Sequence, residues 1–413
     1  MMKILIVSED VPHPSMGGLG QHAVTLAKAL ARQGHQVDFM GNGRHAYDPI
    51  IGLPGRFFSE LRWRFGGWKE TGLGFYNPLR RLVIARALAR AILTRAGNYD
   101  VIHYHGHAPD VAAFIPSTIN FVQSRHDQGA DCLSHTRFRN GAICNETSPR
   151  ACAGCISDNP NFIQTALSAM AVRHYRARVV EAFRRHKTIF VSDMLRRNLT
   201  RTAGPGDWGV VVHNFIDLGA VESAANNPFR LLPGDPELLV VAVAGKLYPP
   251  KGVDKFLEEI APRLDKATRV VILGDGPQES ALRSRFTGAQ ITFMGWRERG
   301  KALELLAGAD LIVVPSVCEE SCATTIFEGL TLGKLVFALD RGGTPELGQY
   351  AMFPGQLQVF PDMASLTAGV LASRPYPNQS GYSPSKWNAD VAASRIVDIY
   401  RMPCKKLGTG TTP

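Results

Sequence analysis

Short apolar runs rich in Val and Ile alternate along the whole chain with segments whose apolar residues repeat at helical spacing, such as HAVTLAKALARQG. The runs are KILIVS, QVDFM, DVIHYH, TINFVQS, TIFVS and VVVHN, and later LLVVAVAG, RVVILGDG, ITFMG, LIVVPS and LVFALD. Apolar strands alternating with amphipathic helices are typical of parallel sheets covered on both faces. Because 413 residues are too many for one ordinary core, the two series predict two Rossmann-like α/β domains.

The expected domain boundary lies in DLGAVESAANNPFRLLPGDPEL, which is rich in Pro, Gly, Ala and Asn. We therefore place an N-terminal domain at 1–216 and a C-terminal domain at 217–384. Segment 385–402 has the pattern of an amphipathic helix that completes the N-terminal domain, and we expect the tail 403–413 to be disordered. The polar stretch 127–160 lacks clear periodicity and is interpreted as an insertion.

The excess positive charge lies in the first half, with 26 Lys and Arg against 16 Asp and Glu through residue 219, and 20 against 20 after it. It concentrates at 56–95, where FFSELRWRFGGW mixes Arg with aromatics, and at 173–201. Such a mixture suits an anionic, partly apolar surface, and a solvated helix face is the alternative. KILIV is too short for a signal peptide, and no run of eighteen apolar residues occurs. We expect a cytoplasmic protein without a nucleic-acid partner, whose N-terminal domain contacts the inner face of a membrane.

The sequence GLGQHA at 18–23 matches the residue pattern of a dinucleotide-binding fingerprint, and Asp38 lies twenty residues after its first glycine. The fingerprint requires its first glycine directly after the strand, whereas EDVPHPSMG separates Ser8 from Gly18. An oxidoreductase is therefore the least favoured interpretation. The glycines Gly17 and Gly18 instead let backbone amides at a helix start approach an anion.

Phosphate-binding features follow the strands of the second half. Lys246 and Lys251 lie on one proline-stiffened loop, AGKLYPPKG, and match the two negative centres of a diphosphate. Gly274 lies in the turn GDGP, and Gly295 ends ITFMGW, where a planar base could lie against the chain.

The segment EESCATTIFEGL follows the strand LIVVPS and carries Glu320 and Glu328. The helix is expected to begin near Thr324 or Thr325, and the sequence from Thr325 to Glu328 is itself a capping box, the structural alternative for Glu328. The amides of this helix start can bind phosphate, while the two carboxylates can accept from sugar and ribose hydroxyls. The amides belong to Cys322, Ala323, Thr324 and Thr325.

The glycine pair near the N-terminus, GKLYPPKG, GDGP, F-x-G, and the two glutamates followed by GG-x-x-E together resemble the retaining glycosyltransferases of family 4. The resemblance covers nearly the whole chain and is strongest over about 240–350. It implies the GT-B fold, in which two Rossmann-like domains face a cleft. The C-terminal domain would hold the nucleotide sugar, and the helix around Trp387 would pack on the N-terminal domain.

The resemblance also implies roles for single residues. Glu320 would contact the donor sugar, Glu328 the ribose, and His126 in SRHD would face the transferred sugar. Lys246 and Lys251 would hold the diphosphate in place of a catalytic metal. Gly17 and Gly18 would line the opposite side of the cleft. The family's Phe-Gly after the first glutamate is replaced here by Cys322 and Ala323, whose methyl group narrows the room beside the sugar.

The function implied is transfer of a sugar, with retention of configuration, from a nucleotide-diphosphate sugar to an acceptor hydroxyl. A UDP- or GDP-sugar is the expected donor, with no cofactor for catalysis. The acceptor is expected to be lipid-linked, as in polysaccharide or glycolipid assembly, or else a small soluble natural product. A sugar-nucleotide epimerase or a phosphorylase on the same fold, and a non-catalytic binding protein, are the alternatives.

Four of the seven cysteines crowd into the insertion at Cys132, Cys144, Cys152 and Cys155. A C-x-x-C pair is a common half of a zinc site, and disulfides are unusual in the cytosol. The interpretations that remain open are a structural zinc ion, with His135 as a substitute ligand, an iron–sulfur cluster, and four free thiols.

Overall fold

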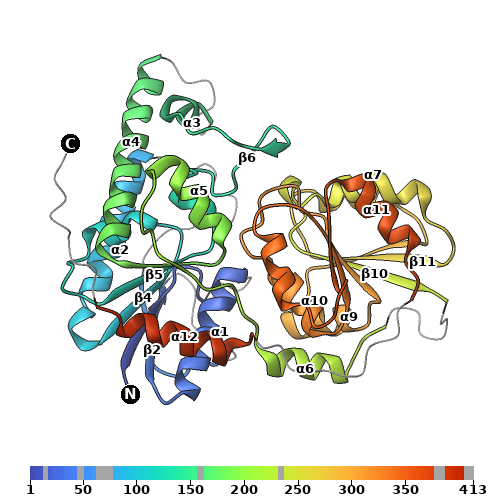
Figure 1. Cartoon of the computed structure of the whole chain (residues 1–413), viewed down its shortest axis with the longest axis horizontal. Coiled ribbons are helices and arrows are strands. Elements are labelled where there is room, and N and C mark those ends of the chain that lie inside the picture. Colours follow the sequence, from blue (N-terminus) through green and yellow to red (C-terminus); the bar gives the residue numbers. More distant parts are fainter. Residues whose placement is uncertain are drawn as a thin grey trace. The chain divides into compact units, whose positions relative to one another are not determined.

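A computed structural model describes residues 1–12, 17–43, 51–61, 78–155, 162–230, 237–375 and 387–403. The chain forms two compact units (Figure 1). The first contains 1–139, 144–214 and the chain from Ala389, and the second contains 140–143 and 215–388. The main division at 214/215 lies beside the boundary expected from the sequence at 216/217.

The first unit is built on a seven-stranded sheet in the order β3-β2-β1-β4-β5-β8-β9, and its strand pairs are parallel. Its strands are β1 (Lys3–Val7), β2 (Gln36–Asn42), β3 (Phe57–Leu61), β4 (Val101–His105), β5 (Phe121–Arg125), β8 (Lys187–Phe190) and β9 (Val210–Val211). Strand β1 is fully buried from Ile4 to Val7, as expected for a central parallel strand.

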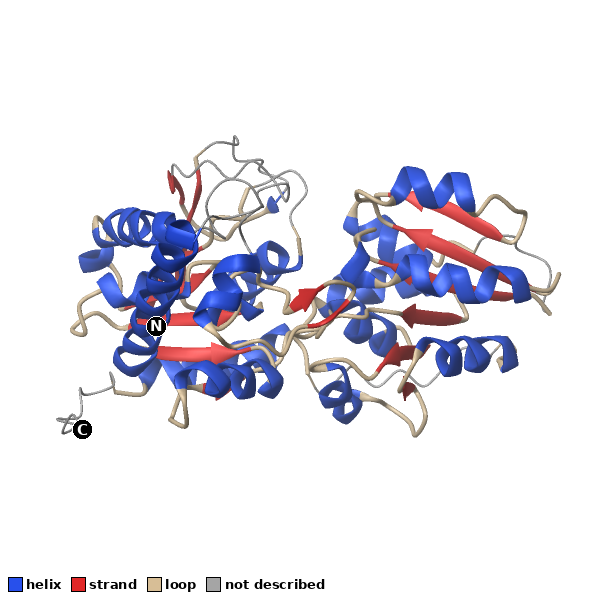
Figure 2. Cartoon of the chain, turned by 90° about the horizontal axis from the view of Figure 1, so that it is seen from above, coloured by secondary structure: helices blue, strands red, loops and turns tan. Residues whose placement is uncertain are grey.

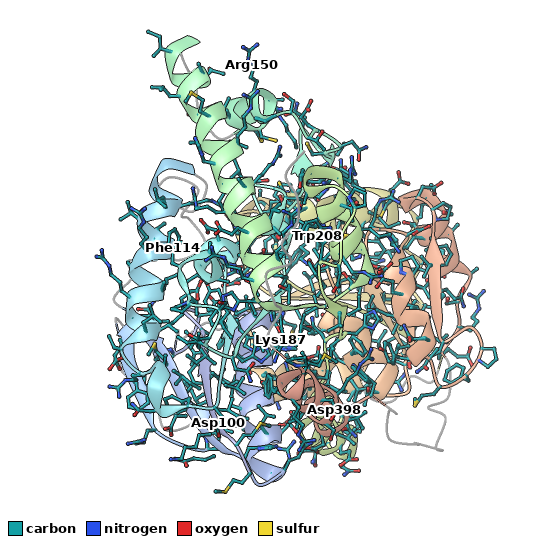
Figure 3. All side chains as sticks on the ribbon, turned by 60° about the vertical axis from the view of Figure 1, so that its left-hand side comes forward. Asp100, Phe114, Arg150, Lys187, Trp208 and Asp398 are labelled. Atoms are coloured by element: carbon teal, nitrogen blue, oxygen red, sulfur yellow. The ribbon has the colours of Figure 1, made fainter. Side chains whose placement is uncertain are left out.

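The helices of the first unit are α1 (Gly18–Arg32), α2 (Pro78–Leu93), α3 (Pro149–Cys155), α4 (Phe162–Arg185), α5 (Asp193–Ala203) and α12 (Ala389–Arg401). Figure 2 shows that helices flank the sheet of each unit. Helix α12 packs against α1, and Arg32 pairs with Asp390 at 2.8 Å. Lys187, labelled in Figure 3, donates to the Tyr400 carbonyl at 3.0 Å and ties the end of α12 to the sheet.

The second unit contains a six-stranded parallel sheet in the order β12-β11-β10-β13-β14-β15. Its strands are β10 (Leu239–Ala244), β11 (Thr268–Leu273), β12 (Ile291–Gly295), β13 (Leu311–Val314), β14 (Leu335–Leu339) and β15 (Leu357–Phe360). Its helices are α6 (Leu218–Asn226), α7 (Val253–Ile260), α8 (Glu279–Arg285), α9 (Arg299–Ala307), α10 (Thr324–Thr331) and α11 (Met363–Ala372). The apolar face of α7, with Phe256, Leu257 and Ile260, joins the strand side chains in one core.

The prediction of two parallel α/β sheets is confirmed, although β3 and β15 were not expected from the sequence. Both are edge strands of four or five residues, FFSEL and LQVF, and most of their residues are only half-buried, so neither has the continuous apolar run of a central strand. The expected C-terminal helix corresponds to α12, which packs on α1 of the first unit, but Trp387 itself lies just before it. The helix begins only at Ala389, and the Trp387 ring lies 5.8 Å from that of Tyr350 within the second unit.

Among the helices of the described ranges, none is long and apolar enough to cross a membrane. Much of the expected basic-aromatic surface, residues 62–77, lies outside the described residues, and so does the expected disordered tail from 404 onward.

Candidate functional site

The strand order of the second unit places the predicted donor residues at one edge. The chain leaves β10 toward β11 on one side and returns to β13 on the other, so the crevice between β10 and β13 is the topological switch point. Ligands of open parallel sheets bind at the carboxyl ends of the strands at such a point. Lys246 and Lys251 follow β10, and Glu320 follows β13.

Lys251 and Glu320 form an ion pair at this edge. Lys251 Nζ donates to Glu320 Oε1 at 2.5 Å, and Ser316 Oγ donates to the same oxygen. Burial would raise the pKa of Glu320, but Lys251 and Ser316 outweigh it and lower that pKa below its usual value. The Glu320 side chain is 9% exposed and that of Lys251 29% exposed, so part of the Lys251 side chain remains accessible at this edge.

Glycines shape the backbone around this pair. Gly252 has φ +65°, and a Cβ there would lie 2.2 Å from the Pro315 carbonyl. Gly342 has φ +63°, and its Cβ would lie 2.5 Å from the Glu320 carbonyl oxygen. The neighbouring amide of Gly343 donates to that same oxygen at 2.7 Å. A side chain at Gly342 would therefore displace the loop that carries Glu320.

Helix α10 begins at Thr324, within the expected range, and the capping box that was the structural alternative for Glu328 does not form. Ala323 is the N-cap, and no side chain caps the helix. The Glu328 carboxylate instead pairs with Arg299 of α9 at 3.1 Å, because Glu328 lies on the inner face of the second turn. Ala323 has no side chain that could cap α10, and the first turn of the helix carries the positive end of its dipole.

The first unit presents a second set of residues at the carboxyl ends of its strands. Gly17 is the N-cap of α1, and Gly18 begins that helix. One turn later His22 packs on His126, which follows β5, with ring centroids 4.5 Å apart. His105 at the end of β4 completes the group, with its Nδ1 lying 3.1 Å from Nε2 of His126. Gly18 and His126 are therefore near neighbours in the fold.

Burial keeps these histidines neutral. It lowers the pKa of His22 to about 3 and those of His105 and His126 well below their usual value. Neighbouring histidines lower the pKa values of His105 and His126 further, because a proton on one ring disfavours a proton on the next. Neutral His126 can accept or donate a hydrogen bond, which suits contact with a sugar hydroxyl.

Asp127 connects this group to the insertion. Its carboxylate lies 2.8 Å from His107 Nδ1 and 3.0 Å from His135 Nδ1. Burial raises the pKa of Asp127, but the two histidines outweigh it and hold that pKa well below its usual value. His107 lies between Asp127 and Asp10, which raise its pKa well above the ordinary value despite burial. His135 is engaged by Asp127 and Arg81, so its expected role as a thiolate substitute is not supported.

Two groups of three close metal-type ligands occur among the described residues. One is His22, His105 and His126, and the other is His107, Asp127 and His135. Within the second group, His107 forms a hydrogen bond with Asp127, and His135 Nδ1 lies 3.0 Å from the same carboxylate. The first group contains His126 and lies near Gly18, where the family resemblance implies contact with the sugar rather than with a metal.

Asp38 has a structural role in β2. Its carboxylate accepts from the Arg56 amide at 2.8 Å and from the Tyr99 hydroxyl at 2.7 Å. Both oxygens are therefore used within the fold, which agrees with setting aside the dinucleotide interpretation.

The sequence analysis missed Ser316, Arg299 and the histidines around His126. The alternation VIHYHGH was a signal, since His103 and His105 are two residues apart and therefore share one face of β4. Their convergence with His22 and His126 depends on three separate elements. No local pattern carries that information.

Solved glycosyltransferase structures share the fold across nearly the whole chain. The Anabaena Alr3699/HepE structure in complex with UDP and glucose has a TM-score of 0.60 at 17% identity and covers 97% of this chain and 99% of that one. Sucrose-phosphate synthase from Thermosynechococcus elongatus has a TM-score of 0.64 at 16% identity and covers 97% and 98%. At such identities the likeness shows the fold alone, which is GT-B.

Curated proteins are similar to this chain over part or most of their length. Sulfoquinovosyl transferase SQD2 of Arabidopsis thaliana is 31% identical over 137 residues, which span 31% of this chain and 26% of that protein. Glycogen synthase of Mycobacterium tuberculosis is 26% identical over 393 residues, covering 89% of this chain and 85% of the relative.

Two family profiles together match most of the sequence. The profile described as Glycosyltransferase Family 4 matches residues 16–220. That described as Glycosyl transferases group 1 matches residues 239–370, which include the Lys251–Glu320 pair. The matches cover both units, one for each sheet, so the chain belongs to the family 4 glycosyltransferases with the GT-B fold.

Proposed function

We propose that this glycosyltransferase moves a hexose from a nucleotide-diphosphate sugar to an acceptor hydroxyl with retention of anomeric configuration. The observation that carries the proposal is the Lys251–Glu320 pair at the switch point beside the uncapped start of α10. A diphosphate placed there meets the Lys251 ammonium and the positive end of a helix. The UDP and glucose in the Anabaena HepE structure support a UDP-sugar as donor.

Each predicted donor residue has a place in this scheme. Lys246 and Lys251 bind the diphosphate together with the amides of α10. Glu320 accepts hydrogen bonds from sugar hydroxyls, since its lowered pKa keeps it ionised at neutral pH. Glu328, oriented by Arg299, accepts from the ribose. The turns at Gly274 and Gly295, with φ +134° and +68°, let the base and phosphates approach the backbone.

The reaction is a front-face displacement. The acceptor oxygen forms a bond to the anomeric carbon as the bond from that carbon to the diphosphate oxygen breaks. The acceptor proton passes to the departing phosphate, which acts as the base. The protein positions the reactants and neutralises the negative charge on the leaving diphosphate, so Lys246 and Lys251 carry most of the catalytic effect. His126 orients the transferred sugar as a neutral hydrogen-bonding group.

An arginine-rich cavity in the first unit supports an acceptor that carries phosphate. The cavity measures about 710 Å³ and lies between α4, α5 and the residues before α3. Among its lining side chains, Glu181 is the one acid, and it is paired with Arg185. The basic side chains lining it are those of Arg173, Arg176, Arg184, Arg185 and Arg201. Arginine forks match phosphate geometry, and such a site suits a lipid-linked phosphate in glycolipid or polysaccharide assembly.

The donor is tested with purified protein and UDP-, GDP-, ADP- and dTDP-sugars, with NAD as a control. One sugar nucleotide, nearly matched by its free nucleotide diphosphate, should raise the melting temperature, because a ligand that binds only the folded state stabilises it. The anomeric configuration of the product, read by NMR, then tests retention. A response to NAD alone would overturn the donor assignment.

The acceptor surface is tested by sedimentation with vesicles of phosphatidylglycerol or phosphatidylcholine. We expect binding to phosphatidylglycerol only, and its loss in Arg173→Glu/Arg184→Glu, whose side chains are exposed. Arg283→Glu/Arg285→Glu on α8 of the second unit is the matched control and should still bind. Equal loss in both variants would mean that net charge, and not this cavity, governs binding.

A further inference from the structure

The four clustered cysteines line one small cavity in the first unit. Its volume is about 30 Å³, and Cys132, Cys144, Cys152 and Cys155 all contribute to the wall. They come from three separate places: the turn after β5, strand β7 (Ala142–Ile143) and its continuation, and α3. Cys152 and Cys155 each lie within electrostatic range of both Cys132 and Cys144. The fold thus gathers four thiols that the sequence spreads over more than twenty residues.

The segment between the first two of these cysteines has an unusual backbone. His135, Arg137 and Asn140 have φ values of 62°, 48° and 52°, and they are the non-glycine residues with positive φ in the described part of the chain. The left-handed region is unfavourable for residues with a Cβ, so surrounding contacts must hold them there. Regular structure contributes little, because β6 (Phe138–Arg139) and β7 have two residues each.

Hydrogen-bond donors lie beside two of the four sulfur atoms. Arg176 Nη2 donates to Cys152 Sγ at 3.3 Å, and Ser134 Oγ lies 3.2 Å from Cys132 Sγ. Arg139 lines the same cavity and acts on the charge of Cys155. Four thiolates around a divalent ion carry a net charge of about −2 by ligand count, and Arg139 and Arg176 offset it.

We propose that Cys132, Cys144, Cys152 and Cys155 bind one structural zinc ion that fixes the shape of the segment 132–155. Four sulfur ligands in a closed tetrahedral set are typical of structural zinc. A cavity of about 30 Å³ has room for a single ion. Binding of the ion draws the four sulfur atoms together and supplies the free energy that orders the segment.

The zinc site has a consequence for the neighbouring histidines. The amide of His135 donates to the Cys132 carbonyl at 3.1 Å, and His135 Nδ1 contacts Asp127, the residue after His126. An ion held by Cys132 therefore fixes the turn that presents His135 to Asp127. The ion itself takes no part in the transfer.

The first experiment measures metal in protein purified without added metal, for the wild type, Cys152→Ser/Cys155→Ser and Cys318→Ser. Cys318 is a buried cysteine of the second unit and is the matched control. We expect about one zinc per chain in the wild type and in Cys318→Ser, and at least a tenfold loss in the double variant. Replacing zinc by Co²⁺ in the wild type should give the visible absorption of a tetrahedral thiolate site.

A second experiment uses the wild type alone, because the double variant can fail to fold. Chelation of the metal should expose Arg137 and Arg139 to trypsin, whereas the zinc-loaded chain should resist cleavage there. The proposal is overturned by wild-type protein that holds no metal and four reactive thiols, by iron with its charge-transfer absorbance, or by a Cys152–Cys155 disulfide. Zinc that persists in the folded double variant would also overturn it and would point to His22, His105 and His126.

Discussion

At the scale of single residues, Lys251 and Glu320 form the interaction on which donor binding depends. Removing Lys251 leaves the Glu320 carboxylate buried beside Ser316 with no opposite charge. Lys251→Met should therefore lower the free energy of unfolding by about 2 kcal/mol, a value reduced from that of a fully buried pair because Lys251 is partly exposed. Urea unfolding monitored by circular dichroism measures this change.

The double variant Lys251→Met/Glu320→Gln separates stability from function. Removing both charges should restore most of the lost stability, while sugar transfer stays reduced by at least 100-fold. Lys255→Met, an exposed position on α7, and Glu319→Gln are the controls, and both should keep activity within about threefold. A double variant that transfers sugar at the wild-type rate would refute the assigned roles.

The buried histidines predict a loss of stability in acid. His22, His103 and His105 are buried, and burial lowers their pKa values in the folded protein, that of His22 to about 3. In the unfolded chain the pKa of each is about 6.5, so below that pH the unfolded state binds more protons than the folded state does. Each histidine then destabilises the fold by about 1.4 kcal/mol per pH unit. His107 acts in the opposite sense, because its raised pKa contributes stability that is fully present below pH ~6.5 and is lost as the pH rises above that value.

Urea midpoints measured between pH 7.5 and 5 should therefore fall steeply below pH ~6.5. His103→Gln should reduce the slope by about one proton, although it also removes hydrogen bonds to Ser124 and Tyr400. His174→Gln, at an exposed site on α4, is the control for replacing a histidine outside the buried group. An unchanged slope in His103→Gln would mean that this histidine does not titrate on unfolding.

At the scale of elements, the loop from β14 to the turn at Gly342 supports the loop that carries Glu320. Gly342→Ala adds a Cβ 2.5 Å from the Glu320 carbonyl at φ +63°, whereas Gly355→Ala adds one at φ +81° with nothing within 4 Å. In both variants an alanine at positive φ destabilises the fold by about 1 kcal/mol. Only in Gly342→Ala does the new Cβ also clash with a neighbouring atom. Gly342→Ala should be less stable than Gly355→Ala by at least ~1 kcal/mol and should lose sugar transfer.

The melting temperature and the rate of sugar transfer are measured for Gly342→Ala and Gly355→Ala. Equal stability and equal activity would show that the Glu320 loop tolerates displacement, and the role given to Gly342 would then be wrong.

The elements also show how far the sequence leads. Short apolar runs predicted the buried strands, because a central parallel strand must be apolar on both faces. The same criterion missed the edge strands β3 and β15. Strand order then explains why Lys251 and Glu320, which are 69 residues apart, meet at one sheet edge. The sequence could not predict the Glu328–Arg299 pair, since a capping box and a tertiary ion pair use the same residue type. The packing of side chains between α9 and α10 decides between them.

At the scale of the whole molecule, each unit has its own sheet, and we expect the stability of one to respond to acid and that of the other to the donor. The buried histidines that respond to acid lie in the first unit, and the residues assigned to the donor diphosphate lie in the second. Scanning calorimetry should accordingly resolve two transitions, because each unit has its own core. Lowering the pH from 7.5 to 5.5 should lower the transition of the first unit more than that of the second.

Saturating UDP should raise only the transition of the second unit, by mass action on the folded state. At a concentration of 100 times the dissociation constant the stabilisation is about 2.7 kcal/mol, enough to move a domain of this size by several degrees. Lys251→Met identifies the unit, since it should lower the same transition and abolish its response to UDP, whereas Lys255→Met should do neither. A response to UDP in the acid-sensitive transition would place the nucleotide in the first unit and contradict the assignment of the donor site to the edge between β10 and β13.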